Sequence, residues 1–117
     1  GDVEYEEFLN IIKIVYGFAG ASVTDENMIR LLLLADRFEL KVVEDKVVSY
    51  ILSSSCSLSI HEKLLISDQF NHTFLKERLI STYTKSQLIA LSDSPEWAEL
   101  SENMTRDIVK RCCKLTG

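Results

Sequence analysis

The sequence has few of the residues that build catalytic or ligand-binding loops. Only four of its 117 residues are glycine, and they lie at the two chain ends or in a single turn. It contains no G-x-x-x-x-G-K, H-E-x-x-H or G-x-S-x-G motif, so no phosphate loop, zinc-protease helix or serine-hydrolase turn is indicated. No nucleophile, acid and base are grouped along the chain. The sequence therefore predicts no catalytic residue, no cofactor and no small-molecule substrate.

Cysteine, histidine and basic charge are also scarce. The three cysteines include the vicinal pair Cys112–Cys113, and no cysteine or histidine stands at a metal-ligand spacing. A formal net charge of -5 argues against nucleic acid, which needs a basic stripe. No apolar run approaches the roughly 20 residues of a membrane span, and no basic-then-apolar leader opens the chain. We expect a soluble cytoplasmic or nuclear domain that binds no metal, nucleic acid or membrane.

What the chain has instead is a near-repeat at a spacing of 32 residues, in which Leu31–Ile51 aligns with Lys63–Tyr83. Identical pairs at this spacing are Leu32 and Leu64, Leu33 and Leu65, Asp36 and Asp68, Phe38 and Phe70, and Ser49 and Ser81. Self-similarity at this period is typical of a helical hairpin used twice, because one hairpin cannot bury its apolar face alone. Stacked hairpins of this kind bind proteins more often than they catalyse reactions.

Apolar residues at helical offsets predict helices along nearly the whole chain. The expected ranges are 4–16, 26–38, 42–52, 59–70, 74–83 and 101–114, with shorter turns between residues 86 and 100. The only candidate strand is Ala21–Val23, which is too short to be more than an edge strand. The predicted fold class is therefore all-α, with stacked helical hairpins.

Two pairs of polar and aromatic residues occupy matched positions of the repeat. We expect Asp36 and Asp68 to cap or brace the next helix of each hairpin rather than to bind a ligand. We expect Phe38 and Phe70 to pack in the core, with contact to a partner as the alternative. Core packing predicts that truncating either ring to alanine costs about 3 kcal/mol or more.

Four segments resemble BTB/POZ proteins. The opening DVEYEEFLNIIKIVYG resembles the family helix that ends near a tyrosine and a glycine, here the adjacent Tyr16 and Gly17. The next segment, ENMIRLLLLADRFELKVVEDKVVSYI, closely resembles the final BTB hairpin with its pattern L-L-x-x-A-D-x-[FY]-x-L-x-x-L. That pattern is matched by two consecutive leucines, Ala35, Asp36, Phe38 and Leu40, with Val43 in place of the last leucine. The second hairpin resembles the three-box or BACK extension, and SPEWAELS is similar to the tail of MATH-BTB adaptors.

The resemblance implies a domain division and a function. Residues 1–55 would be the C-terminal portion of a BTB/POZ domain and residues 56–117 a BACK-like extension, packed as one globular unit. The implied function is a non-catalytic adaptor that contacts a cullin in a ubiquitin ligase. The alternative is a BTB scaffold that oligomerises in transcription or the cytoskeleton without a cullin; a small all-α enzyme or ligand carrier is less favoured. Matched to the family motif, the candidate partner contacts are Tyr16, Phe38, Leu40, Leu58 and Ile60.

The chain departs from the family pattern at its beginning. A complete BTB domain starts with strands and helices that carry an H-K-x-x-L segment and a hydrophobic-x-acidic loop, and neither occurs in this sequence. Because the chain opens on Gly1 rather than methionine, we expect further sequence upstream. We expect weak cullin binding by the chain alone. Without the missing half, the apolar face of the first helix should promote self-association or docking through Phe8, Leu9, Ile12 and Val15.

Overall fold

The computed structural model describes residues 2–16 and 22–115, with side chains for 5–14 and 22–115. Every regular element within these ranges is helical, which confirms the all-α class. Ser22 and Val23 form no strand, and Ala21 lies outside the described residues. No helix in the described ranges is long and apolar enough to cross a membrane.

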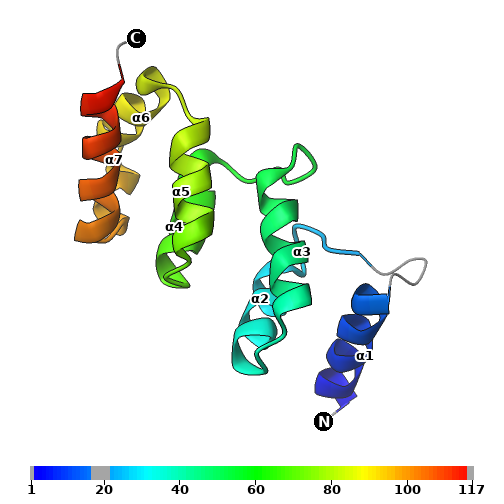
Figure 1. Ribbon diagram of the computed structural model, residues 1–117. Coiled ribbons are helices and arrows are strands. Elements are labelled where there is room, and N and C mark those ends of the chain that lie inside the picture. The colour runs from blue at the N-terminus through cyan, green and yellow to red at the C-terminus, as the bar shows by residue number, and fades with distance from the viewer. Residues whose placement is uncertain (1, 17–21, 116–117) are drawn as a thin grey trace. The chain divides into compact units, whose positions relative to one another are not determined.

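The helices follow one another in antiparallel pairs (Figure 1). Their bounds are α1 Asp2–Tyr16, α2 Met28–Arg37, α3 Lys41–Leu52, α4 Ile60–Gln69, α5 Thr73–Thr82, α6 Lys85–Ser92, the 3-10 helix η1 Pro95–Glu99 and α7 Glu102–Lys114. The chain divides into two compact units, an N-terminal unit, Gly1–Ser57, and a C-terminal unit, Leu58–Gly117. The division falls two residues after the expected boundary at 55/56, and the family assignment of each part stays a prediction.

The near-repeat in sequence corresponds to a hairpin geometry that occurs twice. Helices α2 and α4 begin and end at positions 32 residues apart. After each helix the chain passes through one residue in the left-handed region, Glu39 with φ 54° and Asn71 with φ 51°. These residues are again 32 apart, so the turn is repeated together with the helices.

Backbone hydrogen bonds at the two turns are matched as well. The Leu40 amide donates to the Ala35 carbonyl at 2.8 Å, and the His72 amide donates to the Ser67 carbonyl at 2.9 Å. A hydrogen bond from an amide to the carbonyl five residues earlier, with a left-handed residue just before the amide, is the Schellman motif. It satisfies carbonyls that the end of a helix would leave unpaired. Both hairpins therefore end their first helix by the same mechanism.

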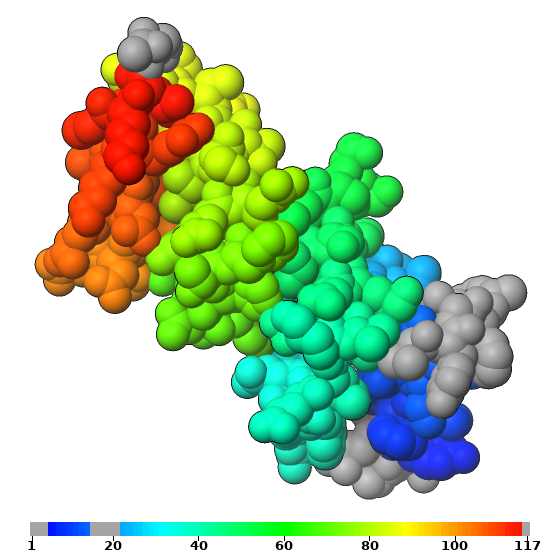
Figure 2. Space-filling view, viewed as in Figure 1, coloured from blue at the N-terminus to red at the C-terminus, as the bar shows by residue number. Residues whose placement is uncertain are grey.

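Each unit has its own apolar core. In the N-terminal unit the buried apolar residues are Ile11, Ile14, Met28, Leu31, Leu32, Leu34, Ala35, Val43, Val47, Val48, Ile51 and Cys56. In the C-terminal unit they are Leu64, Ile66, Leu75, Leu79, Ile80, Leu88, Leu91, Leu100, Met104 and Ile108. Six repeat positions are buried in both hairpins, for example Leu32 with Leu64 and Val43 with Leu75. In Figure 2 the orange-to-red surface of α7 lies against the yellow-green surface of α5.

The expected core position of the two matched phenylalanines is wrong. The side chain of Phe38 is 54% exposed and that of Phe70 is half-buried. Both residues are the C-caps of their helices, where the backbone leaves helical geometry. Their side chains therefore do not continue the buried stripe formed by residues such as Leu31 and Ala35.

Candidate functional site

A groove opens between α1 and α2 in the N-terminal unit. It holds about 320 Å³. Its lining consists of Tyr5, Phe8, Ile11, Leu34 and Phe38 together with Arg30 and Arg37. The exposed fractions are 64% for Tyr5, 53% for Phe8 and 54% for Phe38. We call this surface the aromatic groove, since three exposed rings from two helices meet there.

The aromatic groove is held together by an ion pair and by buried residues of α1. The Arg30 guanidinium pairs with the Glu7 carboxylate and so links α2 to α1. Among the described side chains of α1, Ile11 and Ile14 are buried, and this helix packs against α3. Phe8 stands one helical turn before Ile11, at the edge of this buried stripe, and is 53% exposed.

The second arginine of the groove is placed differently. The Arg37 guanidinium carbon lies 5.3 Å from the centre of the Phe38 ring, within the range of a cation–π interaction. Among the described residues Arg37 has no carboxylate partner. Its charge is thus held at an apolar surface and stays exposed to solvent.

The structure brings some of the predicted site residues together and separates others. Phe38 from the partner set and Phe8 from the self-association set line the same groove. Leu40, Leu9 and Ile12 are half-buried in the same unit. Leu58 and Ile60 are half-buried in the C-terminal unit. The side chains of Val15 and Tyr16 lie outside the described residues.

Sequence reasoning missed Tyr5, Arg30 and Arg37. A signal for the two arginines was present, because Arg30, Leu34 and Arg37 recur at offsets of four and three residues and therefore share one face of a helix. Tyr5 stands one helical turn before Phe8 and could have been found by the same rule.

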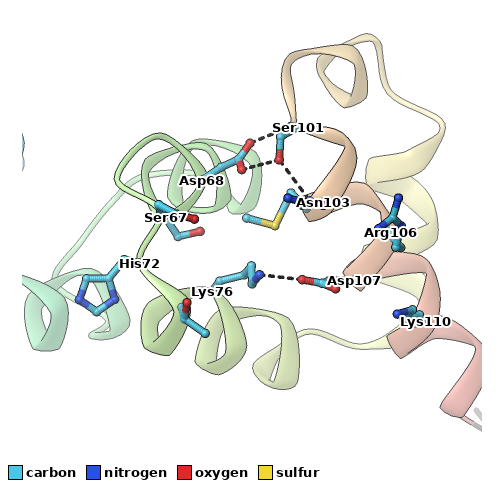
Figure 3. Close-up of a pocket in the computed structure, with 12 residues that line it drawn as sticks. Ser67, Asp68, His72, Lys76, Ser101, Asn103, Arg106, Asp107 and Lys110 are labelled. Carbon is cyan, nitrogen blue, oxygen red and sulfur yellow. Dashed lines mark hydrogen bonds and ion pairs between the residues drawn. The ribbon is translucent and has the colours of Figure 1, made fainter.

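A second groove, in the C-terminal unit, is polar. It lies where the α4–α5 hairpin meets α7 and holds about 390 Å³ (Figure 3). The Lys76 ammonium and the Asp107 carboxylate face each other at 2.6 Å. The Asp68 carboxylate accepts from the Ser101 amide at 2.7 Å and from the Ser101 hydroxyl at 2.6 Å. These charges are satisfied by one another, so the polar groove serves as a joint between helices.

The role expected of the matched aspartates therefore needs correction. Asp68 does not cap or brace α5, the next helix of its hairpin. It holds Ser101, the N-cap of α7, whose hydroxyl accepts from the Met104 amide at 3.2 Å. Asp36 is exposed and makes no side-chain hydrogen bond within the described residues. Asp68 therefore bonds the distant Ser101 and not the next helix of its own hairpin. The Ser101 amide is available as a donor because the first amides of a helix have no partner within the helix.

A cluster of hydrogen bonds around Asp25 links three segments of the N-terminal unit. The Asp25 carboxylate accepts from the Ser57 hydroxyl, the Tyr50 hydroxyl and, at 3.3 Å, the Ser57 amide. The hydrogen bond from the Ser57 side chain, followed by that from Tyr50, lowers the pKa of Asp25. The same carboxylate raises the pKa of Tyr50 to about 12. A carboxylate with this many donors is suited to tying segments together rather than to accepting a proton.

Within the described residues no group of three His, Cys, Asp or Glu side chains is arranged to hold a metal ion. Comparison with family models, curated proteins and solved structures finds no match to this chain.

Proposed function

We propose that the chain is a non-catalytic protein-interaction module, the C-terminal part of a BTB/POZ domain with a BACK-like extension. In this role it acts in the cytoplasm or nucleus as an adaptor or scaffold subunit that contacts a cullin in a ubiquitin ligase. The observation that carries the proposal is the aromatic groove. Exposed Tyr, Phe and Arg side chains gathered in one hollow have the composition of the energetic centre of protein interfaces.

The sequence motif and the groove coincide at one residue. Phe38 is the aromatic position of the A-D-x-F-x-L pattern and also one wall of the groove. A motif residue whose ring is 54% exposed contributes little to the core, so contact with a partner gives it a role. The carboxylates with the densest hydrogen bonding, Asp25 and Asp68, tie segments together, which supports a binding role over a catalytic one.

The alternative is a BTB scaffold that oligomerises without recruiting a cullin. The exposure of Tyr5 and Phe8 on α1 favours it, because an apolar helix face left in solvent promotes association. Light scattering over a concentration series separates the two functions. Growth of the mean mass without any cullin affinity would favour the scaffold.

The test of the adaptor function is calorimetric titration with a purified cullin N-terminal domain. We expect binding weaker than about 1 μM, since the chain carries neither the family loop nor a second linked site that would raise avidity. Phe38→Ala should weaken it by about tenfold or more, the effect of losing an interface anchor.

Phe74→Ala is the matched control. Phe74 has a similar exposed fraction, 57%, and lies on α5 in the C-terminal unit. It should leave cullin affinity unchanged. Absence of binding at high protein concentration, or equal losses in both variants, would contradict the proposal.

A further inference from the structure

The aromatic groove has an unusual charge for this chain. The protein has 18 acidic and 13 basic residues, yet the described side chains that line the groove include two arginines and no acidic residue. A positive hollow on a negatively charged protein attracts partners that bring carboxylates to this location. The groove therefore selects by charge as well as by apolar contact.

Of the two arginines, Arg37 is the one available to a partner. Arg30 is already paired with Glu7 across the groove. Arg37 has its guanidinium held near the Phe38 ring and has no carboxylate partner in the described part of the chain. A guanidinium that is already positioned can donate two hydrogen bonds to a carboxylate in the bidentate geometry. This binding costs less side-chain entropy than binding by a guanidinium that is not positioned in advance.

The form of the groove indicates the conformation of the occupant. The walls are two helices, and the described residues contain no strand whose edge a peptide could extend. A hollow between helices that exposes three rings suits apolar side chains spaced along one face of a helix, at i, i+3, i+4 and i+7. Its volume of about 320 Å³ is room for a few side chains and not for a folded domain.

We propose that the aromatic groove binds an amphipathic helix of a partner protein that carries an aspartate or glutamate beside its apolar stripe, and that Arg37 receives this carboxylate. The proposal rests on the protein-interaction function given above, and it names the chemistry of the partner. Phe8 and Phe38 contact the apolar stripe, while Arg37 sets the register of the helix along the groove.

The test uses the whole chain and three fluorescein-labelled designed helical peptides. All three carry leucines at the i, i+3, i+4 and i+7 positions and differ only in the flanking residues, which are glutamate, glutamine or lysine. Fluorescence anisotropy should give an affinity for the glutamate peptide about tenfold higher than for the glutamine peptide, the size expected for a charge-assisted hydrogen bond. The lysine peptide should bind weakest.

Arg37→Glu is the decisive variant, and Arg78→Glu, an exposed residue of α5, is its control with the same change in net charge. We expect Arg37→Glu to lose the preference for glutamate and to favour the lysine peptide, while Arg78→Glu behaves like the unaltered chain. Because Arg37 is an exposed side chain, its replacement should leave the fold intact. Arg37→Gln provides a second variant, which should bind all three peptides about equally.

The outcomes separate this proposal from the adaptor function. Equal binding of the three peptides, no binding of any, or the same response of both charge reversals would overturn the carboxylate-bearing helix even if the cullin titration succeeds. A glutamate preference that depends on Arg37 would support it even if the cullin does not bind.

Discussion

The two hairpins of the repeat, α2–α3 and α4–α5, have the same core positions and the same Schellman turn, but their surfaces differ. In the second hairpin Asp68 reaches Ser101 on α7, and the His72 ring accepts from the Leu75 amide at 3.1 Å as the N-cap of α5. In the first hairpin Asp36 is exposed, and Leu40, the N-cap residue before α3, makes no side-chain cap hydrogen bond. The second hairpin is thus fastened to its surroundings by polar side chains.

The aromatic residues show the opposite trend. Phe38 of the first hairpin lines an open groove, whereas its counterpart Phe70 is half-buried. Repetition has therefore kept the apolar interior and the ends of the helices, which the backbone requires in both copies. The residues that face outward differ: in the first hairpin they line an open groove, and in the second they join the hairpin to α7.

The largest effect that would sharpen this comparison is expected at the matched rings. Phe70→Ala should lower the free energy of unfolding by about 2 kcal/mol, less than a full core truncation, because the ring is half-buried. Phe38→Ala should cost less than about 1 kcal/mol, since its ring is mostly in solvent. Urea melts of both variants followed by circular dichroism would measure the difference. A loss of 3 kcal/mol at Phe38 would place that ring in the core after all.

A smaller difference is expected between the matched aspartates. Asp68→Ala should destabilise the C-terminal unit by about 1–2 kcal/mol, because the Ser101 amide and hydroxyl lose their acceptor at the start of α7. Asp36→Ala should stay within about 0.5 kcal/mol. Fluorescence of Trp97, in the neighbouring η1 helix, reports unfolding of this unit. Equal effects at the two positions would contradict the contrast between Asp68, which holds the start of α7, and the exposed Asp36.

The smallest effect concerns the left-handed turn residues. Glu39→Gly should stabilise the protein by about 0.5–1 kcal/mol, because glycine relieves the strain of φ 54° at a residue with a side chain. Asn71→Gly should change stability by less than about 0.5 kcal/mol, since asparagine tolerates this region. Thermal unfolding of the pair would test this. A destabilised Glu39→Gly variant would mean that the glutamate side chain makes a contact that outweighs its strain.

The hairpins could be predicted from sequence because their determinants are local. Helical offsets and the identical residues at a spacing of 32 identify the helices, and Ser59 with Glu62 predicts the capping box that begins α4. The buried face of α1 could not be predicted in the same way. In the run FLNIIKIV, apolar residues occupy nearly the whole circumference, so only packing against α3 decides that Ile11 and Ile14 are buried.

The hydrogen bonds between Asp68 and Ser101 also could not be predicted from the sequence. The partners are 33 residues apart, and several other acids lie as close to Ser101 along the chain. The aromatic groove depends both on local sequence and on tertiary packing. Phe38 belongs to a recognisable motif, but its exposure and its meeting with Phe8 follow from how α1 packs.

The cluster at Asp25 has a consequence for how the N-terminal unit responds to acid. One carboxylate joins the segment before α2, the last turn of α3 through Tyr50, and Ser57 at the end of the unit. Because hydrogen bonds from Ser57 and Tyr50 lower the pKa of Asp25 below its unfolded value, this tie contributes its stability above the unfolded pKa and loses it as the pH falls through the folded one. Across the neutral range the carboxylate keeps its charge, so Asp25 stays hydrogen-bonded to Tyr50 and Ser57, and this link is lost only in acid.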